Sequence, residues 1–220
     1  MARANEERAG LMNPRKLVLA TRNQGKLLEF QELLSGFDIE IKSLTDFGPI
    51  PRVSEDGKTF EDNAYKKAHF TAKALGFSAL ADDSGLVVEA LRGAPGVLSA
   101  RYAGEGAGDE ENNRKLLEAM EGMADRRAAF ECVIAIAVPR GPALTYKGRC
   151  EGEITSEALG TNGFGYDPVF YYPPLKKTFA QASREEKNRV SHRGRAMAEL
   201  QREFDKVLIW LEQRLSEEPF

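Results

Sequence analysis

Residues 128–138, AAFECVIAIAV, form an apolar run in which Glu131 is the only charged residue. A continuous apolar run of this length is typical of a strand that is buried on both faces of a sheet. We place it at the centre of the sheet, with residues 144–154 as its partner strand. The run therefore predicts an α/β protein built around a buried central strand.

The N-terminal half adds further elements of the same kind. Residues 16–20, KLVLA, predict a strand that ends in the polar loop 21–26, and LLEFQELL over 27–34 has leucines at helical spacing. Residues 39–44 alternate in polarity and predict a second strand. Residues 48–57 contain two prolines and predict a surface loop.

Two capping signatures predict the starts of helices. Thr59 is followed three residues later by Asp62, and the helix that they begin is expected to end at Gly76. Ser183 and Glu186 repeat the pattern before the C-terminal helix. The apolar stripe of that last helix comprises Ala196, Leu200, Phe204, Leu208, Leu211 and Leu215. This stripe predicts a helix that packs on the sheet.

The acidic pair Asp82–Asp83 is expected on a tight turn, because DDSG separates two strand-like runs, 78–81 and 86–91. Residues 93–108 are rich in glycine and small side chains and predict an irregular loop. A helix is expected to begin at Asp109.

Length, composition and charge limit the function. At 220 residues the chain is expected to fold as one domain over residues 15–220, after an N-terminal extension over residues 1–14. The net charge of −3 argues against a nucleic-acid partner. No run approaches the roughly 20 apolar residues of a membrane span, so we expect a cytoplasmic protein without a membrane partner. Cys132 and Cys150 are expected to be buried, reduced thiols.

The loop after the first strand is a candidate phosphate site, since a helix N-terminus, a lysine and polar side chains can converge there on an anion. The loop comprises Thr21, Arg22, Asn23, Gln24, Gly25 and Lys26. It lacks the spacing of a Walker A motif, and polar strand-to-helix loops are common in α/β proteins. An ordinary connecting loop therefore remains the alternative.

The two adjacent aspartates could hold Mg²⁺ and activate water, because hard cations prefer oxygen ligands. Glu55 would complete the metal site only if the fold brings its loop near Asp83. The alternative is that one aspartate caps a turn while the other is solvated.

The glycine-rich loop 160–167, GTNGFGYD, allows close backbone approach to a ligand and offers Phe164 or Tyr166 as a flat surface for a planar base. An ordinary turn whose aromatic rings enter the core explains the loop equally well.

The basic segment 184–196 supplies hydrogen-bond donors near the start of the last helix, where anions and base carbonyls are favoured. The donors are Lys187, Ser191, His192, Arg193 and Arg195. Taken alone, the segment is also compatible with a solvated helix face.

In this order, these segments resemble the inosine triphosphate pyrophosphatase family, also called HAM1-like or XTP/dITP diphosphatases. The resemblance rests on LVLATRNQGKLLEF, EDGKTFEDNAYKKA, LADDSGLVVEALRGAPGVLSARYAG, GTNGFGYDPVF and REEKNRVSHRGRA. It covers the chain from about Lys16 to the C-terminal helix. One departure is Asn162, where the family more often has a glycine.

The resemblance implies an elongated mixed sheet flanked by helices, with the substrate in a cleft between two lobes, and a homodimer. It implies a Mg²⁺-dependent enzyme that hydrolyses ITP, dITP or XTP to the monophosphate and pyrophosphate and so cleanses the nucleotide pool. Asp83 would be the general base and a metal ligand, and Glu55 a further metal ligand.

The same resemblance assigns the substrate contacts. The loop from Thr21 to Lys26 would contact the triphosphate, and Ser84 would also contact the substrate. The nucleoside would be lined by Phe164, Gly165, Tyr166 and Asp167, with phosphate reached by Lys187 and the base contacted by His192 and Arg193. Two alternatives remain: a Maf-like nucleotide pyrophosphatase, expected to have a different N-terminal signature, and a non-catalytic nucleotide-binding regulator.

Overall fold

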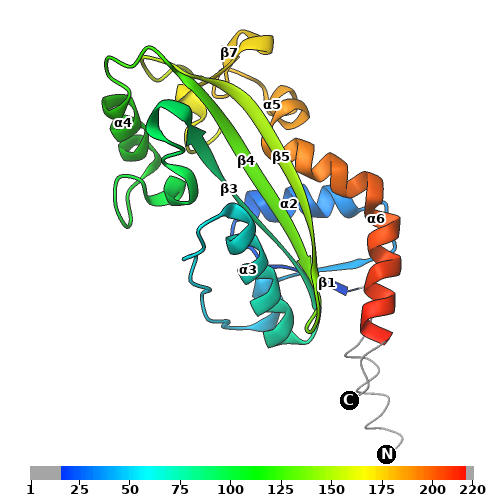
Figure 1. Ribbon diagram of the computed structural model, residues 1–220. Coiled ribbons are helices and arrows are strands. Elements are labelled where there is room, and N and C mark those ends of the chain that lie inside the picture. The colour runs from blue at the N-terminus through cyan, green and yellow to red at the C-terminus, as the bar shows by residue number, and fades with distance from the viewer. Residues whose placement is uncertain (1–15, 217–220) are drawn as a thin grey trace, which may run out of the picture.

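The computed structural model describes residues 16–216 (Figure 1). The N-terminal extension expected over residues 1–14 lies outside this range. Seven strands form one sheet in the order β2-β1-β3-β4-β5-β6-β7. The strands are β1 (Lys16–Leu19), β2 (Glu40–Ser43), β3 (Ser78–Val88), β4 (Arg127–Ala137), β5 (Ala143–Ile154), β6 (Phe170–Tyr172) and β7 (Lys177–Thr178).

The sheet is mixed, since β1 pairs in parallel with β2 and β3 and the remaining neighbours are antiparallel. Strand β4 occupies the middle position, which confirms the place predicted for the apolar run 128–138. Its neighbours are β3, which pairs with residues 128–137, and β5, the strand expected over 144–154, which pairs with it over its whole length.

Five α-helices and five short 3₁₀-helices accompany the sheet in the part of the chain that the structure describes. The α-helices are α2 (Gln24–Leu34), α3 (Phe60–Leu75), α4 (Asp109–Ala119), α5 (Arg184–Val190) and α6 (His192–Ser216). The 3₁₀-helices are η1 (Leu44–Phe47), η2 (Glu89–Leu91), η3 (Gly96–Arg101), η4 (Asp167–Val169) and η5 (Pro173–Leu175).

The two faces of the sheet are covered by different helices, because successive side chains of a strand point to opposite faces. Val133 and Ala135 of β4 pack with the alanine-rich face of α3. Ile134 and Ile136 pack with α2 and the apolar stripe of α6. Figure 1 shows α3 on one side of the long strands, with α2 and α6 on the other.

A second apolar core lies at the far end of the long strands and defines a second lobe. It joins Leu86 of β3, Phe130 of β4 and Cys150 of β5 to α4, β6 and the segment around Phe179. Strands β3, β4 and β5 run from one lobe into the other (Figure 1). The elongated, two-lobed α/β fold implied by the resemblance is therefore confirmed.

The acidic pair does not lie on a turn, and this expectation was wrong. Strand β3 continues without interruption through Asp82 and Asp83, which pair with Ile134 and Val133 of β4. Aspartate is disfavoured in strands, but here each carboxylate accepts hydrogen bonds from a lysine distant in sequence. Tertiary contacts thus outweigh the local turn signal.

The helix boundaries differ from the expected ones at two places. Helix α2 begins at Gln24, inside the predicted loop 21–26, because Asn23 caps it. The segment after Ser183 contains two helices, since Ser191 adopts an extended conformation (ψ 159°) that ends α5. The Ser191 hydroxyl then accepts a hydrogen bond from the Gly194 N–H and caps α6.

Candidate nucleotide site

The loop after β1 is fixed by side-chain caps. The Asn23 side chain accepts a hydrogen bond from the Lys26 N–H at 3.1 Å, and the Thr21 hydroxyl accepts one from the Asn23 N–H at 3.2 Å. Arg22 donates to the Ile50 carbonyl at 2.7 Å and so ties this loop to the loop 48–57. Thr21, Arg22 and Asn23 line a cavity of about 300 Å³ beside that loop.

Lys26 points from the first turn of α2 to Asp82, whose two carboxylate oxygens lie 2.9 and 2.8 Å from the Lys26 ammonium. The Arg193 Nε lies 3.4 Å from the same carboxylate. Burial acts to raise the pKa of Asp82, but the Lys26 and Arg193 cations outweigh it and hold the pKa well below its usual range. Asp82 is therefore a buried counter-ion for two cations.

Asp83 lies with Glu55 around the ammonium of Lys67. Lys67 Nζ is 2.7 Å from Asp83 Oδ1 and 3.4 Å from Glu55 Oε1, and Asn63 donates to Asp83 Oδ2 at 3.3 Å. Burial raises the pKa of Asp83 although Lys67 opposes the shift. The fold thus brings the loop of Glu55 near Asp83, which was the condition for a shared metal site.

The donor set of these two carboxylates fits Mg²⁺. Within residues 16–216, no three His, Cys, Asp or Glu side chains lie close enough to form a complete metal cage. Mg²⁺ does not need such a cage, because it commonly uses one or two carboxylates together with water and substrate phosphates. Asp83 and Glu55 carry carboxylate oxygens of the kind that Mg²⁺ prefers, and Lys67 lies between them as a compensating cation.

The glycine-rich loop is organised by Asp167. Its carboxylate accepts a hydrogen bond from the Phe164 N–H at 2.9 Å and forms an ion pair with Lys187. Gly163 has φ 80° and approaches the Asp167 carboxylate so closely that a Cβ would collide with it. This geometry requires glycine at position 163.

The two aromatic rings of this loop have different places. Phe164 is 54% exposed, whereas Tyr166 is buried and donates its hydroxyl hydrogen to the Ser99 carbonyl at 2.9 Å. Phe164 is therefore available as a flat surface, and Tyr166 belongs to the core of its lobe. The Phe164 ring lies 4.5 Å from Lys187 Nζ and 5.7 Å from Arg193 Cζ.

His192 is buried and stacks on Phe130, with ring centroids 4.7 Å apart and an interplanar angle of 12°. Burial and the neighbouring Arg193 cation lower the pKa of His192 well below its usual value, so the imidazole is neutral. Its Nδ1 has no hydrogen-bond partner among the described residues. His192 can thus offer an unused hydrogen-bonding atom to a ligand.

A cavity of about 200 Å³ brings most of the predicted substrate contacts together. Among its lining residues are Lys26, Ser84, Phe164, Gly165, Tyr166, Asp167, Lys187, His192 and Arg193. A neighbouring cavity of about 420 Å³ shares Phe164, Lys187, His192 and Arg193 with it. Asp83 and Glu55 are not among the residues that line either cavity.

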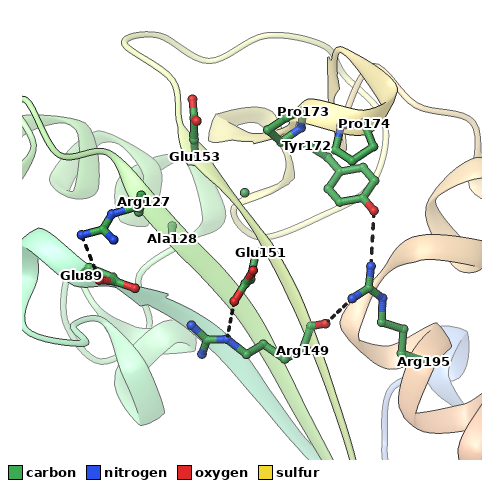
Figure 2. Close-up of a pocket in the computed structure, with 11 residues that line it drawn as sticks. Glu89, Arg127, Ala128, Arg149, Glu151, Glu153, Tyr172, Pro173, Pro174 and Arg195 are labelled. Atoms are coloured by element: carbon green, nitrogen blue, oxygen red, sulfur yellow. Dashed lines mark hydrogen bonds and ion pairs between the residues drawn. The ribbon is translucent and has the colours of Figure 1, made fainter.

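The largest of these cavities, about 690 Å³, lies elsewhere, over β4 and β5 (Figure 2). Charged side chains line it in opposite-sign pairs, such as Arg127 with Glu89 and Arg149 with Glu151. Arg195 lies here, where it donates to the Arg149 carbonyl at 2.8 Å and to the Tyr172 hydroxyl at 3.3 Å. Arg195 is thus directed away from the candidate site, contrary to the expectation that grouped it with His192 and Arg193.

Sequence reasoning missed Lys67 and the role of Asp82. Lys67 lies on α3 next to Lys66, which pairs with the exposed Asp56. Adjacent lysines on a helix look alike in sequence, and only the packing of α3 on β3 directs one of them to Asp83. A search for buried cations near the acidic pair would have found Lys67.

None of the helices within residues 16–216 is both long enough and apolar enough to cross a membrane. The longest, α6, has 25 residues, and its buried apolar side chains pack in one core cluster.

The fold and the site define a class: a two-lobed α/β protein with a cleft that suits an aromatic, phosphorylated ligand. The sequence model of the Ham1 family matches residues 17–203, and the chain belongs to this family. The dITP/XTP pyrophosphatase of Desulfotalea psychrophila is 63% identical over 202 residues, covering 92% of this chain and 91% of the relative.

Solved structures agree with this assignment. A HAM1 protein from Coxiella burnetii superposes with a TM-score of 0.84 at 46% identity, covering 87% of this chain and 98% of that chain. The Ham1 protein of Staphylococcus aureus gives a TM-score of 0.83 at 45% identity, with 87% and 99% covered.

Proposed function

We propose that this protein hydrolyses deaminated purine nucleoside triphosphates, such as dITP and XTP, to the monophosphate and pyrophosphate. The observation that carries the proposal is the 200 Å³ cavity, where one exposed aromatic ring meets two lysines and an arginine. The names of the similar proteins support the same reaction. Removing such nucleotides would cleanse the nucleotide pool.

The purine stacks on Phe164, the ring that its loop leaves exposed. Lys26 and Lys187 supply positive charge to the phosphates, and Ser84 contacts the substrate beside them. The capped N-terminus of α2, with Thr21, Asn23 and Gly25, offers further hydrogen-bond donors to the phosphates, since helix N-termini bind phosphate. Arg22 and Gln24, the other residues of this loop, are likewise proposed to contact the triphosphate.

Asp83 accepts the proton of the water that attacks the α-phosphorus; the bond from that phosphorus to the bridging oxygen breaks, and pyrophosphate leaves. Its raised pKa makes it a better base than an ordinary carboxylate. Asp83 and Glu55 would hold Mg²⁺, which would supply electrostatic stabilisation of the charge on the phosphates. Lys67, which lies between the two carboxylates, must give up part of its contact when a second cation is bound there.

His192 and Arg193 account for the preference for a 6-oxo purine. Arg193 is an obligate hydrogen-bond donor, and a 6-amino group would leave a buried donor unpaired. Asp82 holds the Arg193 guanidinium in the cavity wall. The amino group of dATP is therefore disfavoured at this position.

The proposal also covers the oligomeric state, the subcellular localisation and the partners of the protein. The family resemblance supports a homodimer, and the buried free thiols Cys132 and Cys150 support a reducing compartment such as the cytoplasm. The net charge of −3 supports the absence of a nucleic-acid partner. Light scattering in solution would test the dimer.

One assay separates the proposed function from its alternatives. The protein is incubated with Mg²⁺ and ITP, dITP, XTP, dATP, dGTP or modified pyrimidine triphosphates, and pyrophosphate and orthophosphate are measured separately. Pyrophosphate from the deaminated purines supports the proposal. Orthophosphate as first product overturns the cleavage position, preference for modified pyrimidines favours a Maf-like enzyme, and binding without turnover favours a regulator.

A further inference from the structure

Two side chains of helix α4 form hydrogen bonds to the glycine-rich loop at the same residue, Gly165. The Gly165 N–H donates to Asp109 Oδ2 at 2.6 Å, and Asn113 Nδ2 donates to the Gly165 carbonyl at 2.9 Å. Asp109 and Asn113 lie four residues apart on α4, so both point from the same face of the helix. Both backbone polar groups of Gly165 are thereby held by one helix.

The loop needs such an external hold. Gly160, Gly163 and Gly165 all have positive φ, a conformation that glycine adopts without a side-chain penalty but also leaves easily. Gly165 follows Phe164 directly. Asp167 holds Phe164 itself, since its carboxylate accepts a hydrogen bond from the Phe164 N–H and its own N–H donates to the Phe164 carbonyl at 3.3 Å. The contacts at Gly165 therefore fix the backbone on the C-terminal side of the exposed Phe164 ring.

Helix α4 is itself anchored to the rest of its lobe. Asn112 accepts a hydrogen bond from the Ala103 N–H at 2.7 Å and donates to the Ala100 carbonyl at 3.3 Å. Leu116 packs in the apolar core of the lobe. The hold on Gly165 thus comes from a fixed element.

Asn113 shows a further sign that its amide serves the loop. The residue is 7% exposed, and its Oδ1 has no hydrogen-bond partner in the part of the chain that the structure describes. A buried amide oxygen without a partner costs stability. The amide group of Asn113 is therefore explained by its Nδ2 bond to Gly165 and not by packing.

We infer that Asp109 and Asn113 are positioning residues for substrate binding: they clamp Gly165 and so fix Phe164 as the platform for the purine. This inference rests on the proposed role of Phe164. The clamp residues act through Gly165 and the Phe164 ring, and they do not take part in the bond-breaking step.

The test measures KM and kcat for dITP in clamp variants. Asp109→Ala removes one acceptor and Asn113→Leu removes one donor, and each is expected to raise KM about 5-fold with a smaller change in kcat, as for one lost hydrogen bond. Asp109→Asn keeps an acceptor oxygen and should retain the native KM. Glu110→Gln, an exposed neighbour on the same helix, is the matched control.

A double-mutant cycle with Phe164→Ala gives the decisive comparison. Because the clamp acts through the ring, Asp109→Ala should not raise KM further when Phe164 is absent. An equal rise in both backgrounds, or an Asp109→Asn variant as impaired as Asp109→Ala, overturns the clamp and indicates a direct or charge-dependent role.

The same cycle separates the clamp from the proposed function. If Phe164→Ala alone leaves KM unchanged, the platform itself is wrong. If Phe164→Ala raises KM while both clamp variants keep the native KM, only the clamp is overturned. Thermal melting checks that the Asn113→Leu variant folds. If Asn113→Leu does not fold, Asp109→Ala alone provides the test, because Asp109 is exposed and its substitution leaves the core intact.

Discussion

The ammonium group of Lys67 lies 2.7 Å from the carboxylate of Asp83, a contact between helix α3 and the centre of strand β3. Glu55 reaches the same ammonium at 3.4 Å from a loop without regular structure. The lysine thus compensates two carboxylates that would otherwise repel each other. Any divalent cation bound there shares this role with Lys67.

Asp83→Asn should lower kcat/KM for dITP by about 10³-fold or more, because a general base and a metal ligand are lost together. The measurement is pyrophosphate release with Mg²⁺ in excess. A variant that kept near-native turnover would show that another group accepts the proton.

Lys67→Met should move the acidic limb of the rate profile to higher pH. Burial already raises the pKa of Asp83, and Lys67 is the main influence that opposes the rise. Without the cation the pKa of Asp83 rises further, so the base becomes protonated at a higher pH. Lys66→Met is the matched control, since Lys66 pairs with the exposed Asp56. An unshifted profile in Lys67→Met would contradict this assignment.

Arg193→Gln should reduce the preference for dITP over dATP at least about 10-fold, measured as the ratio of the two kcat/KM values. Arg195→Gln serves as control, because Arg195 lies two residues further along the helix and in the cavity over β5 (Figure 2). Equal loss of preference in both variants would indicate a general effect on α6.

Asp82 should make the free energy of unfolding depend on pH in the acidic range. Its folded-state pKa is held below the unfolded value of about 3.9, so its contribution is present above pH 4 and is lost as pH falls towards the folded pKa. Asp82→Asn should lower the free energy of unfolding by about 3 kcal/mol at pH 7. In urea titrations from pH 7 to pH 3, the difference between wild type and Asp82→Asn should shrink; a constant difference would contradict the ionic role.

Gly148→Ala should destabilise the protein by about 1–3 kcal/mol. A Cβ at Gly148 would lie 2.6 Å from the Ala196 backbone N and even closer to the His192 carbonyl oxygen, so α6 must shift away from β5. We expect a lower melting temperature together with a higher KM for dITP. Gly36→Ala, where a Cβ meets nothing within 4 Å, should change neither quantity.

Much of the fold could be predicted because its signals are local. The apolar run is itself strand β4, and the caps Thr59 and Ser183 directly precede the helices that they begin. The Asp82–Asp83 strand could not be predicted in this way, because its cationic partners Lys26 and Lys67 are 56 and 16 residues away.

The candidate site shows the same division. The segment containing Arg193 and Arg195 is recognisable as basic from the sequence. Side chains two positions apart on a helix, however, point in directions that differ by about 200° around the helix axis. Arg193 therefore faces Asp82, while Arg195 faces the Arg149 carbonyl. Only the orientation of α6 on the sheet decides which arginine enters the nucleotide cavity.

His192 and Arg193 begin a helix of 25 residues, which at 1.5 Å per residue is about 37 Å long. Its apolar stripe, from Ala196 to Leu215, is packed in the core along the length of the helix. A tilt of about 5° about the far end would displace the first turn sideways by about 3 Å, the length of a hydrogen bond. Core substitutions beneath α6 that change its tilt are therefore expected to change nucleotide selectivity as well as stability, even where the substituted residue lies far from the base.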